Sequence, residues 1–151
     1  MTDDWASEKA KELRQRVAAS ERRDALQLDH RRLIEEQGPA LWQTLREKVK
    51  SLCADLNREY HKEVVVFMVT ANDQLQVRFS LGGGISELFA EFSVTTGDAL
   101  TYRFAGPAQS QSHGTSYRLY PINGTVHFTR SINATAPEDI AKEMIDGLLK
   151  G

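Results

Sequence analysis

Residues 106–116 hold the residue types that nucleophilic catalysis uses, namely three serines and His113. A serine nucleophile also needs an acid that orients the histidine and donors that stabilise the oxyanion. This segment offers no acid, and the chain contains no Gly-x-Ser-x-Gly elbow. The pattern therefore favours a surface loop. The alternative is an enzyme that uses His113 or His127 with Arg103 or Arg118.

Gly82–Gly84 is a second candidate, because glycine-rich turns can cradle phosphates. Such a turn joins a strand to a helix, whereas these glycines lie between two predicted strands, which favours a flexible hairpin connection. Glu87 and Glu91 share a strand face but lie about 13 Å apart along an extended strand. That separation is too large for the usual carboxylate pair of a glycosidase.

The four histidines are scattered, without a His-x-x-x-His or Glu-x-x-His spacing. The single cysteine, Cys53, excludes an intramolecular disulfide and a multi-cysteine zinc site. It lies on the apolar side of a predicted helix, as is typical of a buried thiol rather than a nucleophile. The sequence therefore predicts neither a metal nor a cofactor.

The 151 residues carry a net charge of −2, so a general nucleic-acid-binding surface is not expected. The longest apolar run, Val64–Val69, is far shorter than the about 20 residues of a membrane span, so we expect no membrane partner. The chain starts with polar and acidic residues and lacks the pattern of a secretory signal. This favours the cytoplasm.

Good helix formers dominate the start of the chain, and residues 1–62 hold most of its charges. A first helix carries a narrow apolar stripe of coiled-coil width. The stripe consists of Ala6, Ala10, Leu13 and Val17. The arginine pairs further along are interleaved with acidic residues, as is typical of a solvated face rather than a phosphate-binding stripe. Gly38-Pro39 predicts a stop, with a second helix over about 39–60.

From Glu63 the apolar period becomes two, and short turns separate six predicted strands. The strands are 63–71, 74–81, 86–95, 99–105, 116–122 and 125–131. Short connections make neighbouring strands antiparallel. A C-terminal helix follows, with Thr135 as the N-cap of a capping box and Leu149 on its apolar face. The expected fold is α+β, with two N-terminal helices, a six-stranded antiparallel meander and a C-terminal helix packed on one sheet face.

We expect two parts in the chain. Residues 1–37 form a long charged helix that extends from the fold or joins copies of the chain. Residues 38–151 form a single α+β domain, because their strands and flanking helices can share one core.

Three turns set the expected strand registers. The expected pairs are Val66 with Phe79, Met68 with Val77, Phe92 with Tyr102, Ala90 with Phe104 and Leu119 with Phe128. On the opposite face, Arg78 and Arg103 flank the strand that carries Glu91, which predicts a ladder of ion pairs. A ligand site on this polar face is the alternative. Its candidate residues are Arg103, Arg118, Tyr120 and His127, with His127 opposite Tyr120.

The first register places apolar side chains on the outer face of the sheet. These are Val65, Phe67, Val69 and, from the third strand, Phe89. A strand that is apolar on both faces is usually covered on both sides. We therefore expect an interface that includes Leu13 and Val17 of the first helix. The partner is a second copy, as in a homodimer, or another protein.

The favoured function is accordingly a non-catalytic interaction or self-association module. The first alternative is a domain that binds a small apolar ligand or a lipid in a pocket between sheet and helices. The pocket would be lined by Phe79, Phe92, Tyr102, Phe104 and Phe128. The enzyme described above is the second alternative.

Overall fold

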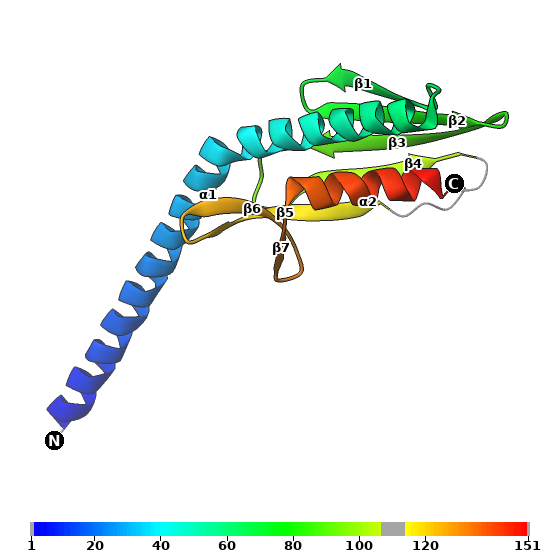
Figure 1. The fold of residues 1–151 in the computed structure, drawn as a ribbon. Helices are drawn as coiled ribbons and strands as arrows, with labels where there is room; N and C mark the ends of the chain where they lie inside the picture. Colours follow the sequence, from blue (N-terminus) through cyan, green and yellow to red (C-terminus); the bar gives the residue numbers. More distant parts are fainter. Residues whose placement is uncertain (1, 107–113, 151) are drawn as a thin grey trace. The chain divides into compact units, whose positions relative to one another are not determined.

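The computed structural model describes residues 2–106 and 114–150 (Figure 1). The fold is α+β, with a seven-stranded antiparallel sheet between two helices in chain order. The elements are α1 (Thr2–Tyr60), β1 (Val65–Ala71), β2 (Gln74–Leu81), β3 (Gly84–Phe92), β4 (Asp98–Ala105), β5 (Thr115–Ile122), β6 (Thr125–Arg130), β7 (Asn133–Thr135) and α2 (Pro137–Leu149). The chain divides into two compact units, residues 1–32 and 33–151.

The prediction of two N-terminal helices is wrong, because α1 runs through Gly38-Pro39 without a break. Pro39 removes one helical N–H, but the turns on both sides are held by tertiary contacts. Ile34 and Trp42 are buried. The Gln37 side chain accepts a hydrogen bond from the Val126 N–H and donates one to the carbonyl of Gly124. Packing therefore outweighs the local preference for a helix stop.

The second half of α1 is attached to β1 and to the turn that follows β1 by side-chain hydrogen bonds. Trp42 donates its indole N–H to the carbonyl of Asn72 at 2.7 Å. The Asn57 carboxamide accepts from the N–H groups of Val64 and Val65 and donates to the carbonyl of Val65 at 2.8 Å. Asn57 thus satisfies both backbone groups of Val65 as a neighbouring strand would.

The strands form a meander in which each strand pairs with its neighbours in sequence. A seventh strand, β7, adds to the six predicted strands. It places Thr135 opposite Phe128, and the N-cap of α2 is Ala136, without a side-chain cap bond. The prediction that Thr135 caps this helix is therefore wrong, because the β6–β7 ladder takes up its backbone.

The predicted register of β1 is wrong by one residue over its first half. Val65 pairs with Phe79 and Phe67 pairs with Val77, and the register shifts between Met68 and Ala71. A bulge adds one residue to a strand and moves every side chain before it to the other face. Val65, only 1% exposed, therefore belongs to the core, and Phe67 packs against it.

The predicted β3–β4 register is wrong by two residues. Ala90 pairs with Tyr102 and Phe92 with Leu100, because the hairpin is centred on Thr96 instead of Gly97. A shift of two keeps each side chain on its predicted face. The β5–β6 register, which Asn123-Gly124 predicts, is confirmed, with Leu119 opposite Phe128.

Helix α2 covers the inner face of the sheet with Ile140, Met144 and Leu148, which are fully buried. Gly147 lies against the ring of Phe104, where a Cβ atom would overlap the ring. Leu149, expected on the apolar face, is partly exposed. The core therefore lies between the inner face of the sheet, residues 33–60 of α1, and α2.

Candidate functional site

The first unit presents an exposed apolar stripe along the helix. Ala6, Ala10, Leu13 and Val17 share one face at 3.6 residues per turn. Leu13 is 58% exposed and Val17 57% exposed, although both residue types usually lie inside proteins. The predicted contacts Leu13 and Val17 are thus exposed side chains on a regular helix.

Basic side chains border this stripe on both sides. On the helical wheel, Lys9 and Arg16 lie along one border and Arg14 along the other. Lys9 forms an exposed ion pair with Glu12 at 3.3 Å. Within the described part of the chain, Arg14 and Arg16 take part in no ion pair shorter than 4.0 Å. The stripe therefore combines an apolar centre with available positive charge.

The outer face of the sheet differs from the predicted interface. Val65 and Phe67 point inward, which leaves Val69 exposed and Phe89 half-buried. The guanidinium of Arg103 covers the Phe89 ring at 4.6 Å from its centroid. Arg78 forms an ion pair with Glu87 at 3.8 Å rather than with Glu91. On this face Arg78 is thus paired with a carboxylate and Arg103 covers an aromatic ring, as on a solvated sheet surface.

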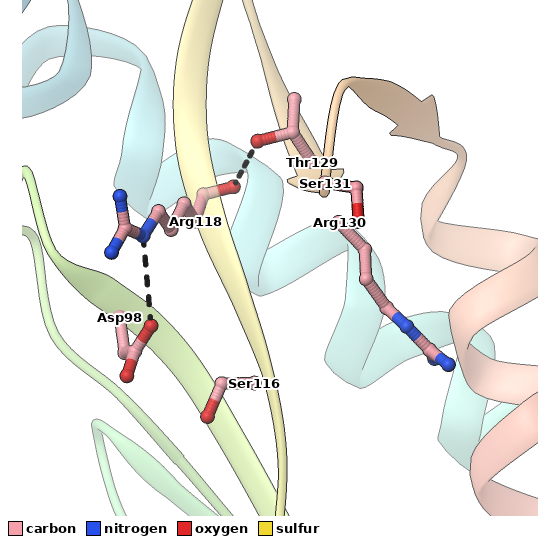
Figure 2. A pocket seen from close by; sticks show the side chains of 6 residues that line it. All are labelled: Asp98, Ser116, Arg118, Thr129, Arg130 and Ser131. Carbon is pink, nitrogen blue, oxygen red and sulfur yellow. Dashed lines mark hydrogen bonds and ion pairs between the residues drawn. The ribbon is translucent and has the colours of Figure 1, made fainter.

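A pocket of about 240 Å³ opens on the outer face where β4, β5 and β6 adjoin (Figure 2). Its lining consists of Asp98, Ser116, Arg118, Thr129, Arg130 and Ser131. The Arg118 guanidinium lies 3.8 Å from the Asp98 carboxylate, and both side chains are more than half exposed. Such an exposed ion pair holds its two groups only weakly.

The polar groups of this pocket do not converge on one point. Figure 2 shows the guanidinium groups of Arg118 and Arg130 directed away from each other. The hydroxyl of Thr129 donates to the carbonyl of Arg118 at 3.3 Å, so this bond links the paired strands β5 and β6. A catalytic site needs a base within reach of a nucleophile and donors aimed at the developing charge. The six lining residues do not show that arrangement.

A second polar cluster, which shares Arg130 with the pocket lining, joins α2 to the inner face of the sheet. The carboxylate of Glu143 accepts from the hydroxyl of Tyr102 at 2.6 Å and from that of Tyr117 at 2.7 Å. Arg130 donates to the same carboxylate at 2.8 Å. Three strands, β4, β5 and β6, therefore meet one helical side chain.

The ionisation of this cluster follows from its contacts. Burial alone would raise the pKa of Glu143. The hydrogen bonds from Tyr102 and Tyr117 and the charge of Arg130 outweigh it, and the pKa lies below its ordinary value. Burial and the bond to Glu143 raise the pKa of both tyrosines. The stable form is a carboxylate between two neutral phenols, which suits a structural role.

The aromatic rings expected to line an apolar pocket pack on one another instead. Phe92 stacks on Trp42 at 5.3 Å between ring centroids and meets Phe128 edge-on at 6.4 Å. Tyr102 meets Phe104 edge-on at 5.8 Å. Phe79 is half-buried against the same core. The structure thus uses these rings as core side chains.

The remaining candidates do not form a single group. His127 pairs across the strands with Tyr120, as predicted, on the outer face with Arg118. His113 lies outside the described residues. Burial raises the pKa of the Cys53 thiol to about 11, which makes this buried side chain a poor nucleophile. In residues 2–106 and 114–150, no three potential ligands are grouped to hold a metal ion.

Sequence reasoning missed Glu143, the centre of the polar cluster. Its partners gave a signal in the sequence, because Tyr102 and Tyr117 occupy inward positions of their strands, where the other residues are apolar. A buried tyrosine hydroxyl usually finds a hydrogen-bond partner. The helix that covers those strands carries few acidic residues on its inner side, and Glu143 directly precedes the buried Met144.

Comparisons with family models, with curated proteins and with solved structures found no match to this chain. Among the described residues, no helix has the length and apolar character needed to cross a membrane.

Proposed function

We propose that the chain is a non-catalytic interaction module whose helical residues 4–32 form the docking surface. The observation that carries this proposal is the exposed stripe with Leu13 and Val17 on a unit separate from the sheet. In proteins, most of the stability of a helix comes from the packing of its apolar face against a neighbouring element. A partner that covers the stripe would supply that packing.

The other two functions have less support. An apolar ligand between sheet and helices would need the space that Phe92, Phe128 and their neighbours fill. An enzyme would need convergent catalytic groups, and the described pocket holds an exposed ion pair and hydroxyls. The interaction module is therefore the function that we propose.

Site-specific photocrosslinking in the cells that express the chain tests this proposal. A photoreactive residue replaces Leu13 in one variant and Arg22, on the opposite face of the helix, in the matched control. We expect a discrete protein adduct from position 13 and a much weaker one from position 22. The proposal fails if position 13 gives no adduct, or if both positions give the same adducts equally.

A further inference from the structure

The stripe on residues 4–32 is a candidate for one particular occupant, because its borders are charged. Between Ala6 and Val17, the two borders of the stripe carry Lys9, Arg14 and Arg16 and no acidic side chain. The acidic residues of the same turns, Glu8 and Glu12, lie away from the stripe on the helical wheel. The positive charge is therefore concentrated beside the apolar residues.

A second copy of the same helix fits the stripe poorly. In a parallel pair, the border positions that meet across the two helices would bring Lys9 against Arg14 of the other copy. In an antiparallel pair, Lys9 would meet Arg16 of the other copy. Like charges therefore oppose the antiparallel pair, and in the parallel pair the contact of Arg16 with Glu21 of the other copy only offsets the repulsion between Lys9 and Arg14.

A lipid surface also fits poorly. Helices that lie in a membrane interface bury a broad face of bulky apolar side chains. Two of the four stripe residues, Ala6 and Ala10, are alanines, which contribute little apolar area. Small side chains instead let a second helix approach closely, since the distance between packed helices depends on the residues at the contact.

We propose that the stripe binds an acidic amphipathic helix of a different protein. Leucine-type side chains of that helix would cover Leu13 and Val17. Glutamate or aspartate on its two borders would pair with Lys9, Arg14 and Arg16. This inference rests on the proposed function and adds to it the chemistry of the partner.

The test uses the full chain and a synthetic helical peptide of roughly four heptads, labelled with fluorescein. The peptide has leucine at its core positions and glutamate on both borders. We expect saturable binding, measured by fluorescence anisotropy. The double variant Arg14→Glu and Arg16→Glu should weaken it by about tenfold or more. The matched control Arg22→Glu changes a charge on the opposite face and should leave binding nearly unchanged.

A second peptide, with lysine in place of the border glutamates, separates docking from general charge attraction. The double variant should bind it better than the unaltered chain does. Equal binding of a scrambled peptide with the same acidic composition would overturn the proposal. The absence of binding at the highest soluble peptide concentration would overturn it as well.

The other occupants have their own readouts. A dimer mass in light scattering that Leu13→Ser abolishes would mean that a second copy covers the stripe. Tighter binding to phosphatidylserine vesicles than to the acidic peptide would mean a lipid surface. Each result contradicts an acidic partner helix. A self-adduct from position 13 in the crosslinking experiment would contradict the acidic partner helix but would still support the interaction module.

Discussion

Residues 4–32 and 33–60 belong to one regular helix but differ in what covers their apolar side chains. In the second stretch, Leu45, Val49 and Trp42 are buried against the sheet. In the first, Leu13 and Val17 are exposed. The second stripe is wider and built of larger residues, so it buries more apolar area per turn. Stripe width, rather than helix propensity, therefore distinguishes the stretch with buried apolar side chains from the stretch with exposed ones.

The largest difference in stability between the two stretches is expected when one leucine in each is replaced by alanine. Leu45→Ala should lower the free energy of unfolding by about 3 kcal/mol, because the fully buried side chain leaves a cavity. Leu13→Ala should change it by less than about 0.5 kcal/mol. Urea unfolding followed by circular dichroism measures both values. Similar losses from the two variants would show that the first stretch is packed as well.

Replacing the Glu143 carboxylate tests how a helix is docked in the second unit. Glu143→Gln should lower the free energy of unfolding by about 1–2 kcal/mol, because the amide cannot serve all three donors equally. Tyr102→Phe, which removes one donor, is the matched control and should cost less. If the glutamine variant is as stable as the unaltered chain, the cluster does not hold α2.

The same cluster predicts a dependence on pH. The pKa of Glu143 is lower in the folded chain than its ordinary value. Its contribution to stability is therefore present above the ordinary pKa of about 4.3 and is lost as the pH falls through the lowered pKa. Unfolding curves at several pH values should show the difference between the unaltered chain and Glu143→Gln shrinking in acid. A constant difference would contradict this role.

The end of α1 allows a smaller test of docking. Asn57→Ala should lower the free energy of unfolding by about 1 kcal/mol, because the backbone groups of Val64 and Val65 lose their side-chain partner. Asn57→Asp keeps the acceptor for the two N–H groups but loses the donor to the Val65 carbonyl. Thermal unfolding should place its stability between those of the unaltered chain and Asn57→Ala, and a stability at or below that of Asn57→Ala would contradict this role of the acceptor.

The smallest effect is expected on the borders of the exposed stripe. The double variant Arg14→Glu and Arg16→Glu should change the free energy of unfolding by less than about 0.5 kcal/mol, because both side chains lie on the surface. A larger loss in urea unfolding would mean that these arginines stabilise the folded chain itself. An unchanged stability, beside the large loss expected from Leu45→Ala, would support the difference in packing between the two stretches.

Local signals predicted much of the sheet. The strand predicted over 74–81 has the same bounds in the structure, and Asn123-Gly124 set the β5–β6 register correctly. The β1 register failed because the bulge between Met68 and Ala71 has no clear signal in a strand of mostly apolar residues. The helix stop at Gly38-Pro39 failed because contacts from distant strands hold both flanking turns.

Less of the candidate site than of the sheet could be predicted from the sequence. Helical spacing placed Leu13 and Val17 on one face of a helix, but the same spacing occurs in the buried stripe of residues 39–60, so only the structure gives their exposure. Val65 and Phe67 were assigned to the outer face through the incorrect β1 register. Glu143 was missed because its role depends on tyrosines from two other elements, which only the folded chain brings together.

The strand order of the meander has a consequence for how the chain folds. Each strand pairs with one that precedes or follows it directly, so the ladders close short loops and lose little chain entropy. The hairpins can therefore form one after another during synthesis. Helix α2 comes after all seven strands and brings Ile140, Met144 and Leu148 to the inner face. A nascent chain that lacks these residues would expose this face, so the time before α2 emerges is when it most needs protection from aggregation.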